Sequence, residues 1–284
     1  MRYFFTALFT SLMISAGAYA QKDSVEAAKP SLTLAAIYAS NANYYGQTAA
    51  DRLPYILTNA SFRLPSGFYI SASAYRLLNL GGSGVSAFDA STGFNWDITS
   101  KLTAGIGYSR SFYPENSPLL QAGNENMASA SLGYDWQIFK TELGGDYSFG
   151  SQQDMFVSFA NSRLIDLGSI GNDKGYFSIE PEIEVVGGTQ HYLEEYTIRK
   201  TNRDKLIDRI KNPFTPPGQT EETETVTTAK TSFDLLSYNL SLPLGYSRGN
   251  YLVEAGYQMS VLGTKVSDSQ KPHSFFNLSF YYQF

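Results

Sequence analysis

Three glutamates stand at alternate positions in one short segment of the chain, at Glu180, Glu182 and Glu184. The positions between and beside them hold Phe177, Ile179, Pro181, Ile183 and Val185. Because successive side chains of a β-strand point to opposite faces, this pattern puts three carboxylates on one face and apolar groups on the other. Like charges two residues apart repel one another unless water, cations or basic groups screen them. The pattern favours contact with small cationic or neutral solutes.

The same alternation places further ionisable residues on the polar face of other predicted strands. The acidic ones are Asp89, Asp135, Glu142, Asp146 and Glu254. The basic ones are Arg63, Lys101 and Lys140, all near predicted strand ends. If these faces line a lumen, its remaining surface is acidic. The alternative is a packed, closed interior in which these bases and inward tyrosines such as Tyr55 and Tyr281 hydrogen-bond the carboxylates.

Catalytic and metal chemistry find little support in the residue types. The chain has two histidines, His191 and His273, and neither has sequence neighbours that would orient it as a general base. It has no cysteine, so a metal site built from Cys and His is disfavoured, and no cofactor motif is evident. Gly81-Gly82-Ser83-Gly84 has no helix after it and is better explained as a turn than as a phosphate loop.

The elements that must position the acidic residues are strands of about ten residues with period-2 alternation, and we count about twelve. They span residues 31–41, 53–63, 67–77, 84–96, 101–111, 126–136, 139–149, 153–165, 175–186, 232–246, 250–262 and 273–284. In several of them the bulky residues share one face and glycine or serine the other. A soluble barrel would put its bulk inside, so this inversion predicts a lipid-facing exterior. Trp96 and Trp136 end two such faces, as an interfacial aromatic girdle requires.

The last strand carries large apolar or aromatic side chains at every second position. They are Phe276, Leu278, Phe280, Tyr282 and Phe284, the final residue. This ending resembles the C-terminal assembly signal of bacterial outer-membrane β-barrels. The resemblance covers one strand and implies an outer-membrane location, contact with outer-membrane lipid and insertion by the barrel-assembly machinery. It is porin-like and points to no specific family.

Residues 1–20 predict a signal peptide, because a basic residue precedes an apolar run that ends in Ala18-Tyr19-Ala20. Residues 21–284 would then form one outer-membrane barrel with a long extracellular loop at 187–231. Within that loop, residues 192–211 have near-helical apolar spacing, and residues 212–230 are rich in proline, threonine and glutamate. The loop could act as a lid, a lumen plug or a docking arm, or be a plain surface loop. With both termini periplasmic, most predicted periplasmic turns are short and most extracellular connections long.

Composition agrees with this fold class. The formal net charge of −5 gives no indication of nucleic-acid binding, and 43% hydrophobic residues is low for a helical membrane protein. The sequence therefore predicts an all-β, transmembrane antiparallel up-and-down barrel, with a secreted β-sandwich as the alternative fold. For function it favours a channel or binding protein for small cationic or neutral solutes. A closed structural, assembly or secretion accessory and an outer-membrane enzyme are the alternatives, and oligomeric state is left open.

The terminal pattern leads to a first prediction. Phe284→Asp places a charge at the end of the lipid-facing row, so we expect less protein in the outer membrane and loss of heat-modifiable gel mobility. Gln283→Asp, on the opposite face of the strand, is the matched control. Wild-type amounts of heat-modifiable Phe284→Asp protein in the outer membrane would contradict the terminal-signal interpretation.

Overall fold

The computed structural model describes residues 29–48, 52–79, 84–114, 124–150, 153–169, 175–189, 233–264, 266 and 271–284. Over these residues, fourteen strands form one sheet. They are β1 (Ser31–Ala39), β2 (Tyr55–Arg63), β3 (Phe68–Leu77), β4 (Ala87–Asp97), β5 (Leu102–Phe112), β6 (Asn126–Asp135), β7 (Lys140–Phe149), β8 (Gln153–Ser162), β9 (Ile165–Ser169), β10 (Gly175–Ile179), β11 (Glu182–Thr189), β12 (Phe233–Arg248), β13 (Tyr251–Leu262) and β14 (His273–Gln283).

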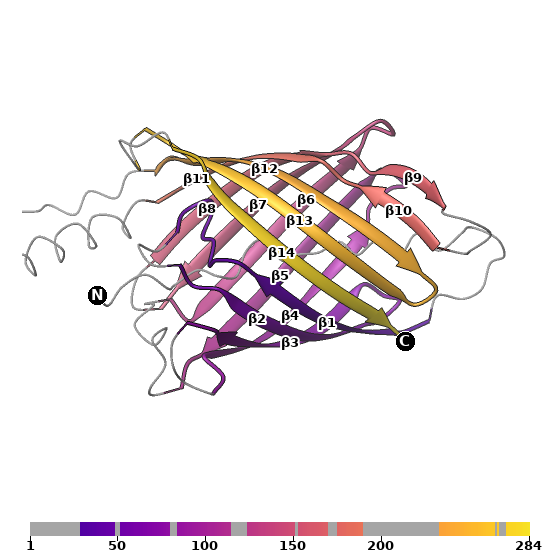
Figure 1. Ribbon diagram of the computed structural model, residues 1–284, viewed down its shortest axis with the longest axis horizontal. Helices are drawn as coiled ribbons and strands as arrows, with labels where there is room; N and C mark the ends of the chain where they lie inside the picture. Colours follow the sequence, from indigo (N-terminus) through magenta and orange to yellow (C-terminus); the bar gives the residue numbers. More distant parts are fainter. Residues whose placement is uncertain are drawn as a thin grey trace, which may run out of the picture.

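Twelve of these strands close into an antiparallel barrel (Figure 1). From β1 to β8 each strand pairs with the next, β8 pairs with β11, and β11 to β14 continue the cylinder. β14 completes it by pairing with β1, from Thr33 opposite Gln283 to Ala39 opposite Asn277. The predicted fold class and strand number of the barrel are confirmed.

The two ends of the barrel differ in their connections. At the end where Phe284 lies, tight turns join β2 to β3, β4 to β5, β6 to β7 and β12 to β13. Outer-membrane barrels keep their short turns on the periplasmic side. We therefore name this end periplasmic and the opposite end extracellular.

The outer surface of the barrel is apolar. Ile106 is 55% exposed, Leu132 44% and Leu278 55%, although each lies in the middle of a strand. Their neighbours Gly105, Ser131 and Asn277 belong to the opposite face and are less exposed. Exposed aliphatic residues alternating with small or polar ones would be unfavourable in water, whereas in a bilayer they meet hydrocarbon.

Aromatic residues gather near the periplasmic end of this surface. Trp136 lies 4.5 Å from Tyr134 and 6.0 Å from Phe139 between ring centroids, and it is 53% exposed. Trp96 is 39% exposed and packs 6.0 Å from Phe94. Amphipathic rings at one level of a barrel suit the membrane–water interface.

Inside the barrel, one side is filled by a cluster of buried apolar residues. It includes Ile37 on β1, Leu57 on β2, Tyr75 and Leu77 on β3, and Tyr281 on β14. Tyr55 also packs against this cluster, so both of the inward tyrosines named in the sequence lie here. The interior is therefore not lined by polar groups throughout, because β1 to β3 present a bulky apolar face to it.

Two predicted strands are interrupted near the periplasmic end. The span 153–165 ends as β8 at Ser162 and resumes as β9, and the span 175–186 is divided into β10 and β11 at Glu180 and Pro181. The long β12 pairs with β11 along its first half and with β10 along its second. Proline has no N–H to give to a ladder, which accounts for the break at Pro181. Residues 166–169, which the sequence placed in the connection between the strands predicted at 153–165 and 175–186, instead belong to the β9–β10 hairpin.

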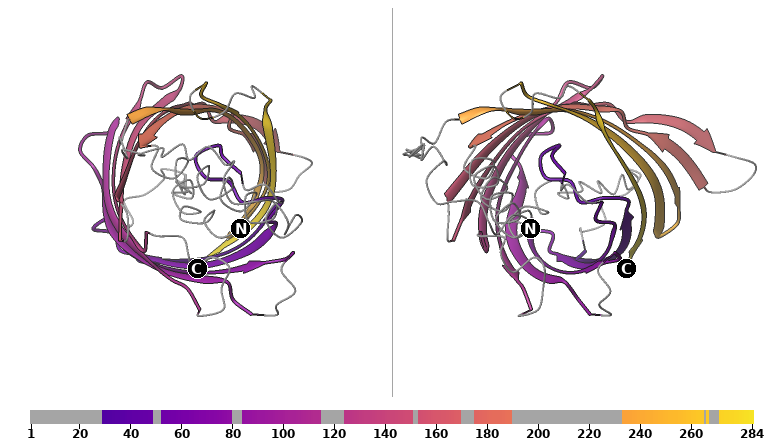
Figure 2. Two further views of the ribbon diagram at one scale, coloured as in Figure 1. Left: turned by 90° about the vertical axis from the view of Figure 1, so that its left-hand side faces the viewer. Right: turned by 60° about the vertical axis from the view of Figure 1, so that its left-hand side comes forward.

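The connection from β1 to β2 differs from a plain extracellular loop. Residues 41–48 leave the extracellular end of β1 and turn into the barrel, where the indigo segment is visible within the ring of strands (Figure 2). The predicted signal peptide and residues 190–231 of the predicted extracellular loop lie outside the described residues. Residues 187–189 of that loop belong to β11.

Gly67 in the β2–β3 turn supports a second prediction. Its φ of 93° is unfavourable for other residues, and an added Cβ would meet the backbone oxygen of Asn95. Gly67→Ala should lower the free energy of unfolding by about 2 to 4 kcal/mol, combining backbone strain with overpacking. Urea unfolding in detergent, followed by tryptophan fluorescence, measures this change.

Gly249→Ala in the β12–β13 turn is the matched control. Gly249 also has a positive φ, 57°, but nothing lies within 4 Å of an added Cβ. Only the strain of about 1 kcal/mol should remain. Equal losses in the two variants would show that the contact with Asn95 does not constrain the turn.

Candidate functional site

The glutamate row lies on the inner face of β11 and at the break before it. Glu182 and Glu184 are half-buried, whereas Ile183 between them is 60% exposed on the lipid side. Glu180 lies on the same face as Glu182 and Glu184, because the pairing with β12 continues across the break, where the Glu180 N–H donates to the Pro243 carbonyl at 3.2 Å. The local alternation of the sequence is therefore enough to aim all three carboxylates into the barrel.

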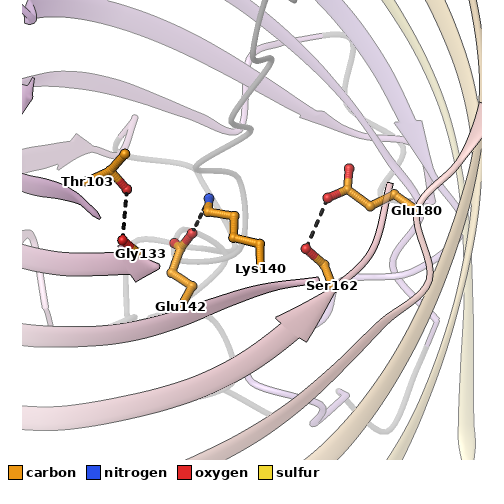
Figure 3. Close-up of polar contacts among 6 residues, drawn as sticks. All are labelled: Thr103, Gly133, Lys140, Glu142, Ser162 and Glu180. Atoms are coloured by element: carbon orange, nitrogen blue, oxygen red, sulfur yellow. Dashed lines mark hydrogen bonds and ion pairs between the residues drawn. The ribbon is translucent and has the colours of Figure 1, made fainter. Parts of the chain in front are cut away.

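Neighbouring strands add partners toward the periplasmic end. The Ser162 hydroxyl at the end of β8 donates to Glu180 Oε1 at 3.0 Å. On β7, Lys140 Nζ lies 2.8 Å from Glu142 Oε2 in an ion pair whose side chains are 34% and 40% exposed. Figure 3 shows the Lys140, Glu142, Ser162 and Glu180 side chains extending into the space that the strands enclose.

Toward the extracellular end, two carboxylates accept hydrogen bonds from neutral donors. Asn239 Nδ2 on β12 donates to Glu184 Oε2 at 2.9 Å. The hydroxyl of Tyr45, in the inward-turned β1–β2 connection, donates to Asp146 Oδ2 on β7 at 2.9 Å. Hydroxyl and amide groups orient these carboxylates without neutralising their charge.

We define the acid cluster as Glu142, Asp146, Glu180, Glu182, Glu184 and Glu254. Glu182 experiences the charges of Glu184, Glu180, Glu142 and Lys140, and Glu254 on β13 experiences that of Glu180. Among the contacts of this cluster with other described residues, the basic group is that of Lys140. Within the described residues the cluster therefore brings six carboxyl groups together with one ammonium group, an excess of acidic side chains that favours a negative potential.

The other predicted acidic residues lie elsewhere. Asp89 on β4 is 3% exposed, opposite Ser111 of β5 and beside the apolar side of the interior. Asp135 ends β6, is exposed, and accepts a hydrogen bond from the Gln137 N–H at 2.6 Å in the β6–β7 turn. The structure thus gathers six of the eight predicted acidic residues and separates these two from them.

The predicted basic residues are similarly divided. Lys140 joins the acid cluster, whereas Arg63 at the end of β2 lies over the Tyr69 ring at 5.9 Å. Lys101 is exposed in the β4–β5 turn. The positive charges of Arg63 and Lys101 therefore lie at the periplasmic rim, away from most of the acid cluster.

The residues of the predicted C-terminal signal lie on the outer face of β14. Phe276 is 56% exposed, Leu278 55%, Phe280 46% and Phe284 64%, while Tyr282 packs edge-on against Phe284 at 4.7 Å. Their exposure suits lipid contact. Their part in assembly stays a prediction.

Sequence reasoning missed the residues that hold the carboxylates in place. Ser162, Asn239 and Tyr45 are ordinary polar residues, and their partners are 18, 55 and 101 positions away. The Tyr45-Gly46 pair could have indicated a tight turn, because glycine favours positive φ, but no local signal says that the turn points inward.

Neither metal ligation nor a membrane helix is evident in the part of the chain that the structure describes. No three His, Cys, Asp or Glu residues among those described could together hold a metal ion. Within the same residues, no helix has the length and apolarity needed to cross a membrane.

Comparisons with known proteins find similar barrels but no family. No protein-family model and no curated protein matches the chain. The solved KdgM porin aligns with 89% of this chain and 99% of its own, with 8% identity and a TM-score of 0.48. The NanC porin aligns with 88% of this chain and 98% of its own, with 8% identity and a TM-score of 0.45. LpxR from Salmonella typhimurium aligns with 89% of this chain and 99% of its own, with 12% identity and a TM-score of 0.43. Likeness at this level concerns the fold alone.

The closed ladder, the apolar exterior and the partly polar interior together define a porin-like bacterial outer-membrane β-barrel. The protein is located in the outer membrane, and no specific family within this class is indicated.

The negative potential of the acid cluster can be tested chemically. The chain has no cysteine, so Glu182→Cys introduces a single thiol. We expect it to react faster with a cationic than with an anionic methanethiosulfonate reagent. The rate ratio should exceed that of Val85→Cys, at an exposed position outside the cluster, by about tenfold, or about 1.4 kcal/mol. Equal ratios at the two positions would show that the cluster carries no net negative potential.

Proposed function

We propose that this protein is an outer-membrane channel that lets small cationic or neutral solutes pass. The observation that carries the proposal is the acid cluster, in which carboxylates from β7, β11 and β13 and the β10–β11 break share one basic partner among the described contacts. A purely structural interior would be expected to pair buried charges, because an unpaired one is costly away from water. The excess of carboxylates supports a hydrated path.

The cluster would act through its field. Carboxylates along a narrow lumen enrich cations and deplete anions over about one Debye length, roughly 10 Å at 0.1 M salt. Selectivity should therefore weaken as the salt concentration rises.

Neutral solutes would be admitted on a different basis. Ser162 and Asn239 place a hydroxyl and an amide beside the carboxylates, and both can exchange hydrogen bonds with an uncharged polar molecule. The negative potential does not repel an uncharged molecule, whereas it repels an anion.

One observation supports a closed accessory barrel as the second candidate. The apolar cluster around Ile37, Leu57 and Tyr75 fills one side of the interior, and the β1–β2 connection packs on it through Ala42 and Leu53. If side chains also fill the rest of the cross-section beside this connection, no path remains, and the carboxylates would be held by Lys140 and their neutral donors alone.

Reversal potentials in a planar bilayer distinguish the two candidates. Under a salt gradient the wild-type protein should give a cation-selective potential, and Glu180→Gln combined with Glu182→Gln and Glu184→Gln should move it toward zero. Neutralising Asp97, Glu125 and Asp166, three exposed acidic residues outside the cluster, is the control and should leave it near the wild-type value.

Three outcomes decide the proposal. A potential unchanged by the triple glutamine variant would remove the row from the pathway. A shift of equal size in the control would show that overall charge is responsible. No conductance from folded, heat-modifiable protein would favour the closed accessory barrel.

A further inference from the structure

The β1–β2 connection forms a compact structure inside the barrel, which we name the tongue and define as residues 41–48. Its tip is a two-residue turn, in which the Tyr44 N–H donates to the Gln47 carbonyl at 2.9 Å and the Gln47 N–H donates back at 2.8 Å. Tyr45 and Gly46 between them have φ values of 46° and 87°. Two positive φ values characterise the tight turns that join hairpin strands, so the tip is a defined structure.

The base of the tongue is fixed to the wall from which it starts. The Leu53 N–H donates to Asn41 Oδ1 at 2.7 Å, which joins the two limbs of the connection. Ala42 and Leu53 are each 6% exposed and belong to the apolar cluster of β1 to β3. Buried apolar contact and a hydrogen bond at the base favour one direction for the tongue.

The tip reaches the opposite wall. Tyr45 donates to Asp146 on β7, which stands six strands from β1 in the order of a twelve-strand barrel and therefore halfway round it. The Ser237 hydroxyl on β12 donates to the Tyr45 carbonyl at 2.7 Å, across 192 residues of sequence. Through these contacts the tongue spans the interior from one wall to the other, and Figure 2 shows its indigo segment within the ring of strands.

Close packing accompanies these hydrogen bonds. The Tyr45 ring stacks on Phe156 of β8 at 4.1 Å, and Tyr44 meets the same ring edge-on at 5.3 Å. A Cβ added to Gly46 would lie 2.6 Å from Ser237 Cβ and 2.9 Å from Asn239 Oδ1. Glycine is therefore required at the tip both for its φ and for its approach to β12.

We infer that the tongue is the constriction of the barrel and that Tyr45 and Gly46 set the largest solute that can pass. The inference rests on the proposed channel function, and it assigns the size limit and the charge selectivity of the channel to different residues. Along β11 and β12 the tip contacts lie at the level of Ser237 and Asn239, on the extracellular side of the Glu182–Ser241 pair. A solute entering from outside would meet the tongue first, which limits its size, and then the remaining acid cluster, which selects its charge.

Gly46→Val tests the inference, because its side chain cannot fit against β12 and must move the tip. Single-channel conductance should rise by about twofold or more, since a displaced tip frees part of the narrow cross-section that twelve strands enclose. Proteoliposome swelling should admit larger neutral sugars. The reversal potential should stay cation-selective, because the glutamate row is intact. Gly249→Val, at a turn with open space around it, is the matched control and should change none of these.

A second variant tests the inference in case Gly46→Val does not fold. Tyr45→Phe combined with Ser237→Ala removes two hydrogen bonds of the tip without adding bulk, and it should shift the size limit in the same direction. If folded wild-type protein conducts and neither variant raises conductance or the size limit, the tongue is not the constriction.

A measurement that needs no conductance separates failure of this inference from failure of the proposed function. In intact cells, Glu182→Cys can be labelled from outside with a small or a bulky maleimide. The rate with the bulky reagent, relative to the small one, should rise several-fold when Gly46→Val is added. A rise without any conductance would keep the tongue as the constriction and reject the open channel. An unchanged ratio would reject the tongue even in a conducting protein.

Discussion

The structure depends on one requirement, that every backbone N–H and C=O group within the bilayer finds a partner in the protein. Hydrocarbon offers none, so a sheet that crosses it must close on itself. The pairing of β14 with β1 provides this closure, and β11 joins the wall by pairing with both β8 and β12. The β9–β10 hairpin lies outside the closed ring. It is tolerated there because it extends the wall at one end of the barrel.

Closure then fixes what faces inward. Because the two-residue period commits bulky apolar residues to lipid, the alternate positions of most strands outside the β1–β3 side carry small, polar or charged groups. On β11 those positions are Glu182 and Glu184, so the fold that satisfies the backbone also concentrates negative charge. Neutral donors such as Ser162 and Asn239 orient the carboxylates but leave their charge in place, and this excess is the basis of the proposed preference for cations.

The interior has a second, opposite character. Ile37, Leu57 and Tyr75 make the β1–β3 side apolar, and this side holds the base of the tongue, while Asp146, Phe156 and Ser237 receive its tip. The tongue is thus supported at both ends by side chains of unlike chemistry. Size and charge would be controlled by different residues of one interior, which is why the two can be altered separately.

The sequence by itself determined the strands, their inner and outer faces and the inward direction of the glutamate row, because a two-residue period is a local property that any ten-residue segment displays. Only the tertiary structure decided the rest. The separation of Asp89 and Asp135 from the acid cluster and the inward path of the tongue depend on which distant strands become neighbours. Tyr45 meets Asp146 and Ser237 across 101 and 192 residues, and contacts at that separation follow from barrel closure, which leaves no mark on the segments involved.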